Sequence, residues 1–131
     1  MTSNSYKKLT TVLVIACLAL LALCASLFWS YGWLKLHVAF ASEQTKIFED
    51  MRTRAMASDV GGAVGCLEYV TWYYPSGTKQ EPGSRLDQMV ERERATATRD
   101  IIAYLRKKTG EDLSDDPEAW INKYGASQSA K

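Results

Sequence analysis

A run of uncharged, mostly apolar residues from Leu9 to Leu34 limits what this chain can fold into more than any other feature. Lys8 and Lys35 close the run on its two sides. A helix of about 20 apolar residues spans a hydrocarbon layer of about 30 Å. The sequence therefore predicts a single transmembrane helix over residues 9–34, preceded by an N-terminal tail at residues 1–8.

Three fates are open to this segment: a retained anchor, a cleaved signal peptide or a lipoprotein signal. The apolar region of a signal peptide has about 7–15 residues, which is shorter than this run, and the possible cleavage site Ala39-Phe40-Ala41 lies well beyond it. Cys24 resembles a lipobox cysteine, but Leu23 stands where that pattern needs a small residue. We therefore expect an uncleaved anchor, and a secreted helical protein if residues 1–41 are removed.

Aromatic residues at one end of the run support a membrane anchor. Trp29, Tyr31 and Trp33 gather at its C-terminal end, and Trp and Tyr favour the membrane–water interface.

The charged residues that flank the run indicate its orientation. Lys7 and Lys8 favour a cytoplasmic N-terminus, although several basic residues also follow the run. Because long C-terminal domains are translocated largely regardless of charge, we expect a cell (inner) membrane protein whose C-terminal domain lies outside the cytoplasm.

The remainder of the chain is nearly neutral. Two of the 16 Lys and Arg residues precede the run, which leaves 14 of them against 15 Asp and Glu. A general nucleic-acid binder needs a basic footprint, so no nucleic acid is expected as a partner. Residues 35–125 suit one small domain.

This domain is predicted to be all-α, because no stretch alternates with period two and Pro and Gly fall at junctions. The expected elements are three helices and a short C-terminal helix; they cover residues 38–58, 60–74 and 84–109, and the segment between Asp116 and Gly125. Only Gly32 separates the first of them from the membrane helix, so the two can be continuous. Residues 126–131 are small and polar, and a disordered tail is expected there.

Local signals fix the helix ends. Asp59, Ser84 and Asp116 are expected N-caps, and Gly110 suits a left-handed stop. Trp120 is expected to dock onto the domain from the last helix.

Ala57, Gly61 and Gly65 form a ridge of small residues four apart. Glycine in a helix costs about 1 kcal/mol against alanine, so the ridge indicates either the close approach of a neighbouring helix or a frayed helix start.

Two turn signals, Pro75-Ser76-Gly77 and Glu81-Pro82-Gly83, bracket the only expected loop. Its order of Gly, Thr and Lys does not fit a phosphate-binding loop. We expect a solvated connection.

Four arginines are the candidate interaction residues. They lie seven positions apart on the predicted helix 84–109, a spacing that drifts only about 20° per heptad, and they are Arg85, Arg92, Arg99 and Arg106. They can contact an acidic partner or phosphate groups, or they can simply form a solvated face.

No set of residues predicts catalysis. Glu93 and Asp100 are expected near the apolar face of the same helix, about 10 Å apart along its axis, which favours an ion pair with Arg52 or Arg54 over shared acid–base chemistry. His37 is the only histidine and Cys66 the only cysteine beyond the run, so neither a zinc site nor a Cys–His pair is expected. The prediction is a protein without cofactor or metal that is not an enzyme.

Two stretches carry a resemblance. They are residues 66–70 continuing to Tyr74-Pro75-Ser76-Gly77-Thr78-Lys79-Gln80, and Thr109–Leu113 with Asp115–Trp120. Over about residues 60–124 they resemble small membrane-anchored bacterial helical proteins of unknown function. The second stretch is also similar to the closing segment of some bacterial helical-repeat modules. The resemblance implies a helical domain in a bacterial envelope and transfers no catalytic residue.

The sequence thus predicts a single-pass membrane-anchored helical interaction or scaffold protein, in contact with the lipid bilayer and with a protein partner or a second copy of itself. A regulatory subunit of an envelope enzyme or transporter is the alternative. A stable stoichiometric partner would distinguish the second from the first.

Overall fold

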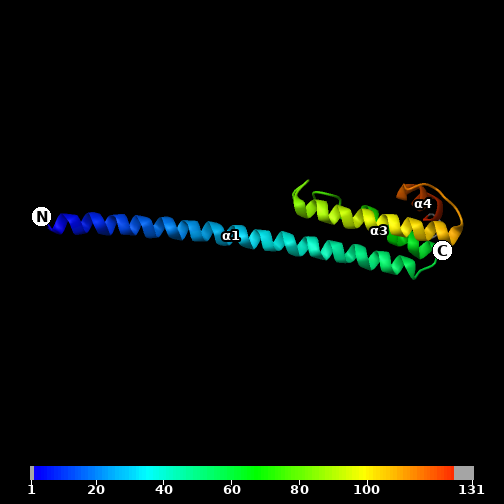
Figure 1. The fold of residues 1–131 in the computed structure, drawn as a ribbon, viewed down its shortest axis with the longest axis horizontal. Coiled ribbons are helices and arrows are strands. Elements are labelled where there is room, and N and C mark those ends of the chain that lie inside the picture. The colour runs from blue at the N-terminus through cyan, green and yellow to red at the C-terminus, as the bar shows by residue number, and fades with distance from the viewer. Residues whose placement is uncertain (1, 126–131) are drawn as a thin grey trace. The chain divides into compact units, whose positions relative to one another are not determined.

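The computed structural model describes residues 2–125, and this part of the chain is all-α, with four helices and no strand (Figure 1). The helices are α1 (Thr2–Met56), α2 (Val60–Trp72), α3 (Arg85–Thr109) and α4 (Pro117–Tyr124). The expected disordered tail at residues 126–131 lies outside the described residues. The chain divides into two compact units, Met1–Leu36 and His37–Lys131.

The N-terminal unit consists of the first part of α1. It includes residues 2–8, which the sequence assigned to a tail, as part of the helix. The described side chains from residue 4 to residue 36 are exposed, the large apolar ones included. Between Asn4 and Met56, α1 is long and apolar enough to cross a membrane. A core helix of a water-soluble protein would bury such side chains against its own domain, and this one does not.

The C-terminal unit is built on the helix ends that the sequence predicted. Asp59 Oδ1 accepts a hydrogen bond from Gly62 N at 2.8 Å, and Ser84 Oγ accepts one from Asp87 N at 3.2 Å. Asp116 caps α4, and Gly110 ends α3 with a φ of 74°. These side chains satisfy amide groups that the helix itself leaves unpaired.

Two predicted helices end earlier than expected. The helix expected to end at residue 58 ends at Met56, where a short turn leads to Asp59. The helix expected to reach Tyr74 ends at Trp72, because its C-cap residue Tyr73 has an extended ψ of 113° and leaves the right-handed helical region.

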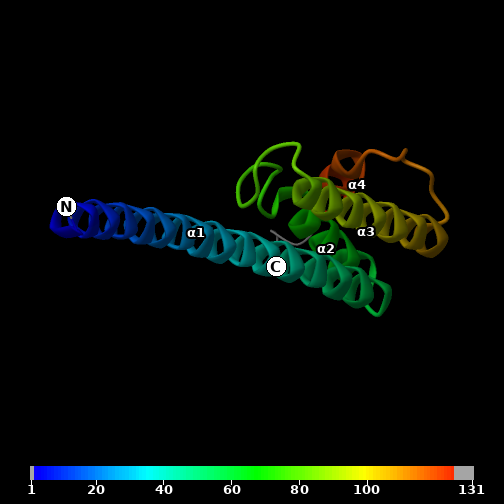
Figure 2. The same cartoon turned by 60° about the vertical axis from the view of Figure 1, so that its left-hand side comes forward.

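The core of this unit draws one large side chain from each helix. Phe48 of α1, Leu67 of α2, Ile101 of α3 and Trp120 of α4 are fully buried. Helix α2 packs against both α3 and α4 (Figure 2). The expected docking of Trp120 is confirmed, and its Nε1 donates a hydrogen bond to Ser114 O at 3.0 Å, so the indole is buried without an unpaired donor.

The small-residue ridge on α2 has no close neighbour at Gly65. That residue is exposed, and a Cβ added to it would meet nothing within 4 Å. The tight position is Gly62, where an added Cβ would lie 2.8 Å from Ser58 Cβ. Close helix approach therefore does not explain Gly65.

Candidate interaction surface

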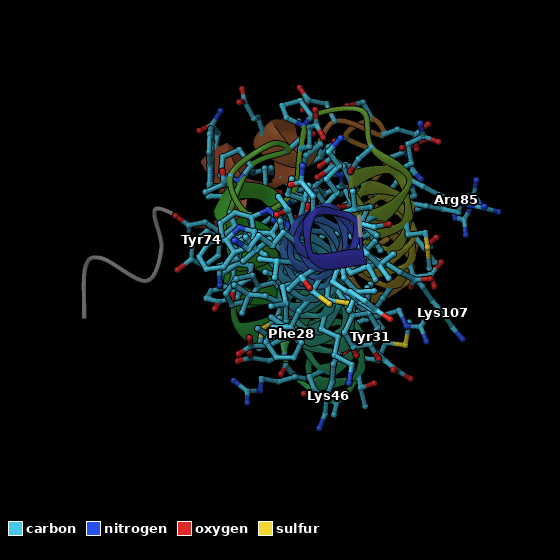
Figure 3. All side chains as sticks on the ribbon, turned by 90° about the vertical axis from the view of Figure 1, so that its left-hand side faces the viewer. Phe28, Tyr31, Lys46, Tyr74, Arg85 and Lys107 are labelled. Carbon is cyan, nitrogen blue, oxygen red and sulfur yellow. The ribbon has the colours of Figure 1, made fainter. Side chains whose placement is uncertain are left out.

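Two of the four candidate arginines are free to meet a partner. Arg85 and Arg92 are exposed, and no ion pair within the described residues engages either guanidinium. Figure 3 shows Arg85 projecting away from the ribbon of α3.

The other two arginines have partners inside the domain. Arg99 Nε lies 3.6 Å from Asp100 Oδ1, although its side chain remains 74% exposed. Arg106 binds both Asp112 and Asp115 at 2.8 Å, and its hydrogen bond is the main reason why the pKa of Asp112 falls below the usual range. Arg106 therefore links α3 to the segment that precedes α4, and the exposed members of the candidate set are Arg85, Arg92 and Arg99.

A groove opens between α1 and α3 beside Arg92. Its volume is about 640 Å³. The lining side chains are of mixed charge with one exposed methionine, and they are Ser42, Thr45, Lys46, Glu49, Arg52, Met89, Arg92 and Glu93. Met89 is 54% exposed, so the groove combines three basic and two acidic side chains with an apolar contact and two hydroxyl groups.

An ion pair connects the two helices that form the groove. Arg52 of α1 lies 3.3 Å from Asp100 of α3, which confirms the expected pairing of this carboxylate. The expected place of Glu93 was wrong. Glu93 is exposed and lines the groove, because the buried positions of α3 lie elsewhere on its circumference.

The loop between α2 and α3 is mostly exposed, and a buried carboxylate organises it. Asp87 accepts hydrogen bonds from Ser76 Oγ at 2.7 Å, from Gly83 N at 2.9 Å and from Gly77 N at 3.3 Å. The Ser76 hydroxyl and then the Gly83 amide hold the pKa of Asp87 below its usual range. Gly77 and Gly83 both have positive φ angles, of 82° and 75°, which glycine adopts without steric cost.

The same loop is tied to α1 on its other side. His37 Nδ1 and Lys79 O are hydrogen-bonded at 3.1 Å. Since a carbonyl oxygen can only accept, the imidazole nitrogen is the donor. The side chain of Gln80 is buried, and in the orientation that satisfies its amide it donates to Gln44 Oε1 at 3.2 Å. The ammonium group of Lys79 lies 4.2 Å from the ring centroid of Tyr74 and 5.0 Å from that of Phe40.

Arg94 is the central polar residue that the sequence analysis missed. Its guanidinium donates to Val70 O at 2.5 Å and to Tyr74 O at 2.6 Å. Its side chain is only 12% exposed and lies over the Phe48 ring at 4.7 Å. Arg94 therefore ties three helices together at the C-terminal end of α2, where the last carbonyl groups of a helix need donors.

The two residues most able to do chemistry are engaged in structural contacts. Cys66 is buried, and burial raises the pKa of its thiol although the charge of Arg54 lowers it, so the reactive thiolate is disfavoured. His37 binds the loop through Lys79 O. Neither residue lines the groove beside Arg92.

Comparison with protein-family models, with curated proteins and with solved structures finds no match for this chain.

Proposed function

We propose that this chain is a single-pass, membrane-anchored interaction module of the bacterial envelope, whose helical domain binds a protein partner through the groove and the free arginines of α3. The anchor is residues 9–34, and the domain is residues 37–125. The N-terminus lies in the cytoplasm and the domain outside it. Lys7 and Lys8 support this orientation, since positive flanks remain inside.

The membrane role is supported by exposure and by the position of Ala41. The apolar side chains of the N-terminal unit are exposed along the helix, and a hydrocarbon environment would cover them. Ala41 belongs to the buried core of the C-terminal unit. Cleavage after Ala41 would cut α1 inside the packed domain, so a retained anchor fits the fold better than a signal peptide.

One observation carries the binding role: Arg92 is exposed, has no ion pair among the described residues and lines the groove next to the exposed Met89. Arginine and methionine are both enriched at protein interfaces. Lys46 lies on the opposite wall of the groove and also bears a positive charge. Figure 3 shows its side chain projecting away from the ribbon of α1. The partner that fits is a protein surface with an acidic residue beside an apolar one.

The test is crosslinking in intact membranes followed by purification and mass spectrometry. The variant Arg85→Gln/Arg92→Gln removes two charges at the proposed surface. The control Lys107→Gln/Lys108→Gln removes two charges from exposed positions at the other end of α3. We expect the first variant to lose its crosslinked partner and the control to retain it.

Salt gives a second readout. Because exposed charges are screened within about 10 Å at 0.1 M salt, recovery of the partner with the unmodified protein should fall as salt rises. Equal recovery with the two double variants, or recovery that does not respond to salt, would show that Arg85 and Arg92 form only a solvated face.

A further inference from the structure

We infer that the α2–α3 loop, residues 74–83, forms a lipid-facing surface that rests in the headgroup layer of the membrane through Tyr74 and Lys79. This inference depends on the proposed membrane anchor and adds a second contact between protein and lipid. Its ligand is the phospholipid headgroup, with the phosphate facing the ammonium group and the glycerol region facing the aromatic rings.

Chain connectivity places the loop near the lipid. Lys35 closes the apolar run, and His37 lies two residues after Lys35. Two residues of chain span at most about 7 Å. The interfacial layer is about 5–7 Å thick on each side of the hydrocarbon. The hydrogen bond from His37 Nδ1 to Lys79 O then holds the loop at the level of His37.

The loop is held in a fixed conformation. On one side Asp87 accepts hydrogen bonds from Ser76, Gly77 and Gly83. On the other side the buried Gln80 hydrogen-bonds to Gln44 and to Ala41 N. A loop fixed between α1 and α3 presents the same side chains continuously, so binding lipid does not require it to become ordered first.

The side chains presented are those that favour an interface. Tyr74 is 40% exposed, and Figure 3 shows its ring pointing outward. The ammonium group of Lys79 lies over the rings of Tyr74 and Phe40. Tyrosine favours the headgroup level, and lysine is attracted to lipid phosphates. Glu81 balances the charge of Lys79 within the loop, so the surface suits zwitterionic as well as anionic lipid.

The test uses the full-length chain in phosphatidylcholine vesicles that contain a nitroxide on the headgroup. A polar fluorescent maleimide is attached at one of three positions, Lys35→Cys, Thr78→Cys or Lys107→Cys. Cys17 and Cys24 are replaced by alanine in every variant. Cys66 remains, because its buried thiol reacts slowly, and the background without an added cysteine measures any residual labelling.

We expect the label at position 78 to be quenched nearly as strongly as the label at position 35, and several-fold more than the label at position 107. Quenching at position 35 together with equal, weak quenching at 78 and 107 would overturn the lipid-facing loop and leave the anchor standing. Absence of quenching at position 35 would overturn the anchor, and the loop inference with it.

A charge variant tests the role of Lys79. Lys79→Gln in the Thr78→Cys protein should reduce quenching at position 78, and Lys107→Gln in the same protein should not. Circular dichroism confirms that each labelled variant retains its helices. Unchanged quenching in the Lys79→Gln protein would overturn the contribution of the ammonium group.

Discussion

At the scale of single residues, Arg94 has the strongest effect that we expect on stability. It satisfies two carbonyl groups at the end of α2 and lies over the Phe48 ring. Hydrogen bonds from a charged donor contribute about 1.5–3 kcal/mol each, and their contributions do not simply add.

We therefore expect Arg94→Ala to lower the free energy of unfolding by about 2–4 kcal/mol, measured by urea denaturation in detergent. Arg92→Ala is the matched control two positions away, and as an exposed residue it should change stability by less than about 0.5 kcal/mol. Similar losses for the two variants would contradict the structural role of Arg94.

Asp87 gives the loop a dependence on pH. Its folded-state pKa is lowered, mainly by Ser76 and then by Gly83, whereas the unfolded-state pKa is about 3.9. The stabilisation is therefore fully present above the unfolded-state pKa and is lost as the pH falls through that value towards the folded pKa.

We expect Asp87→Asn to lower the free energy of unfolding by about 1–3 kcal/mol at neutral pH, because the amide cannot accept all three hydrogen bonds. The difference from the unmodified protein should shrink as the pH is lowered below about 4. Denaturation at a series of pH values measures it. A difference that stays constant down to acidic pH would show that the charge of Asp87 is not what stabilises the loop.

At the scale of helices, Gly65 weakens α2 without any packing benefit that the structure shows. Alanine favours a helix over glycine by about 1 kcal/mol, and an added Cβ at Gly65 meets open space. Gly65→Ala should therefore raise the free energy of unfolding by up to about 1 kcal/mol.

Gly62→Ala is the control for this prediction. Its added Cβ would lie 2.8 Å from Ser58 Cβ, so this substitution should give no gain or a loss. Thermal unfolding followed by circular dichroism compares the two. Destabilisation by Gly65→Ala would mean that the exposed side of α2 has a packing partner after all.

The helices also show how far local sequence signals reach. The N-caps Asp59, Ser84 and Asp116 and the stop at Gly110 depend on contacts within one turn of chain, and each was predictable. The loop 74–83 was not, because Asp87, His37 and Gln80 act on it from other parts of the fold.

The candidate site was predictable in part for the same reason. Seven-residue spacing placed Arg85 and Arg92 on an exposed face of α3. The same spacing gave no sign that Arg106 binds Asp112 and Asp115, since that pairing depends on how the chain turns after Gly110. The groove depends on how α1 lies against α3, and Arg94 depends on where α2 ends; neither follows from the pattern of one helix.

At the scale of the whole molecule, the fold makes a prediction about processing. The possible cleavage site ends at Ala41, which is buried in the core, and Phe40 and His37 hold the loop. Removal of residues 1–41 would take these contacts away.

We therefore expect mass spectrometry of protein extracted from membranes to find the intact N-terminal sequence. The control is Ala39→Trp, which removes a small residue that the cleavage site needs at an exposed position. Apart from the substitution itself, the mass of this variant should equal that of the unmodified protein. Ala41→Trp is not used, because Ala41 is buried. A mature chain that begins at Ser42 would contradict the retained anchor.

The position of Trp120 has a consequence for biosynthesis. This side chain is fully buried and lies on the last helix of the described chain. Its docking partners on α2 are made much earlier by the ribosome. Until α4 is synthesised, the apolar face of α2 has no cover from it. The core around Trp120 therefore cannot be completed before α4 has been synthesised.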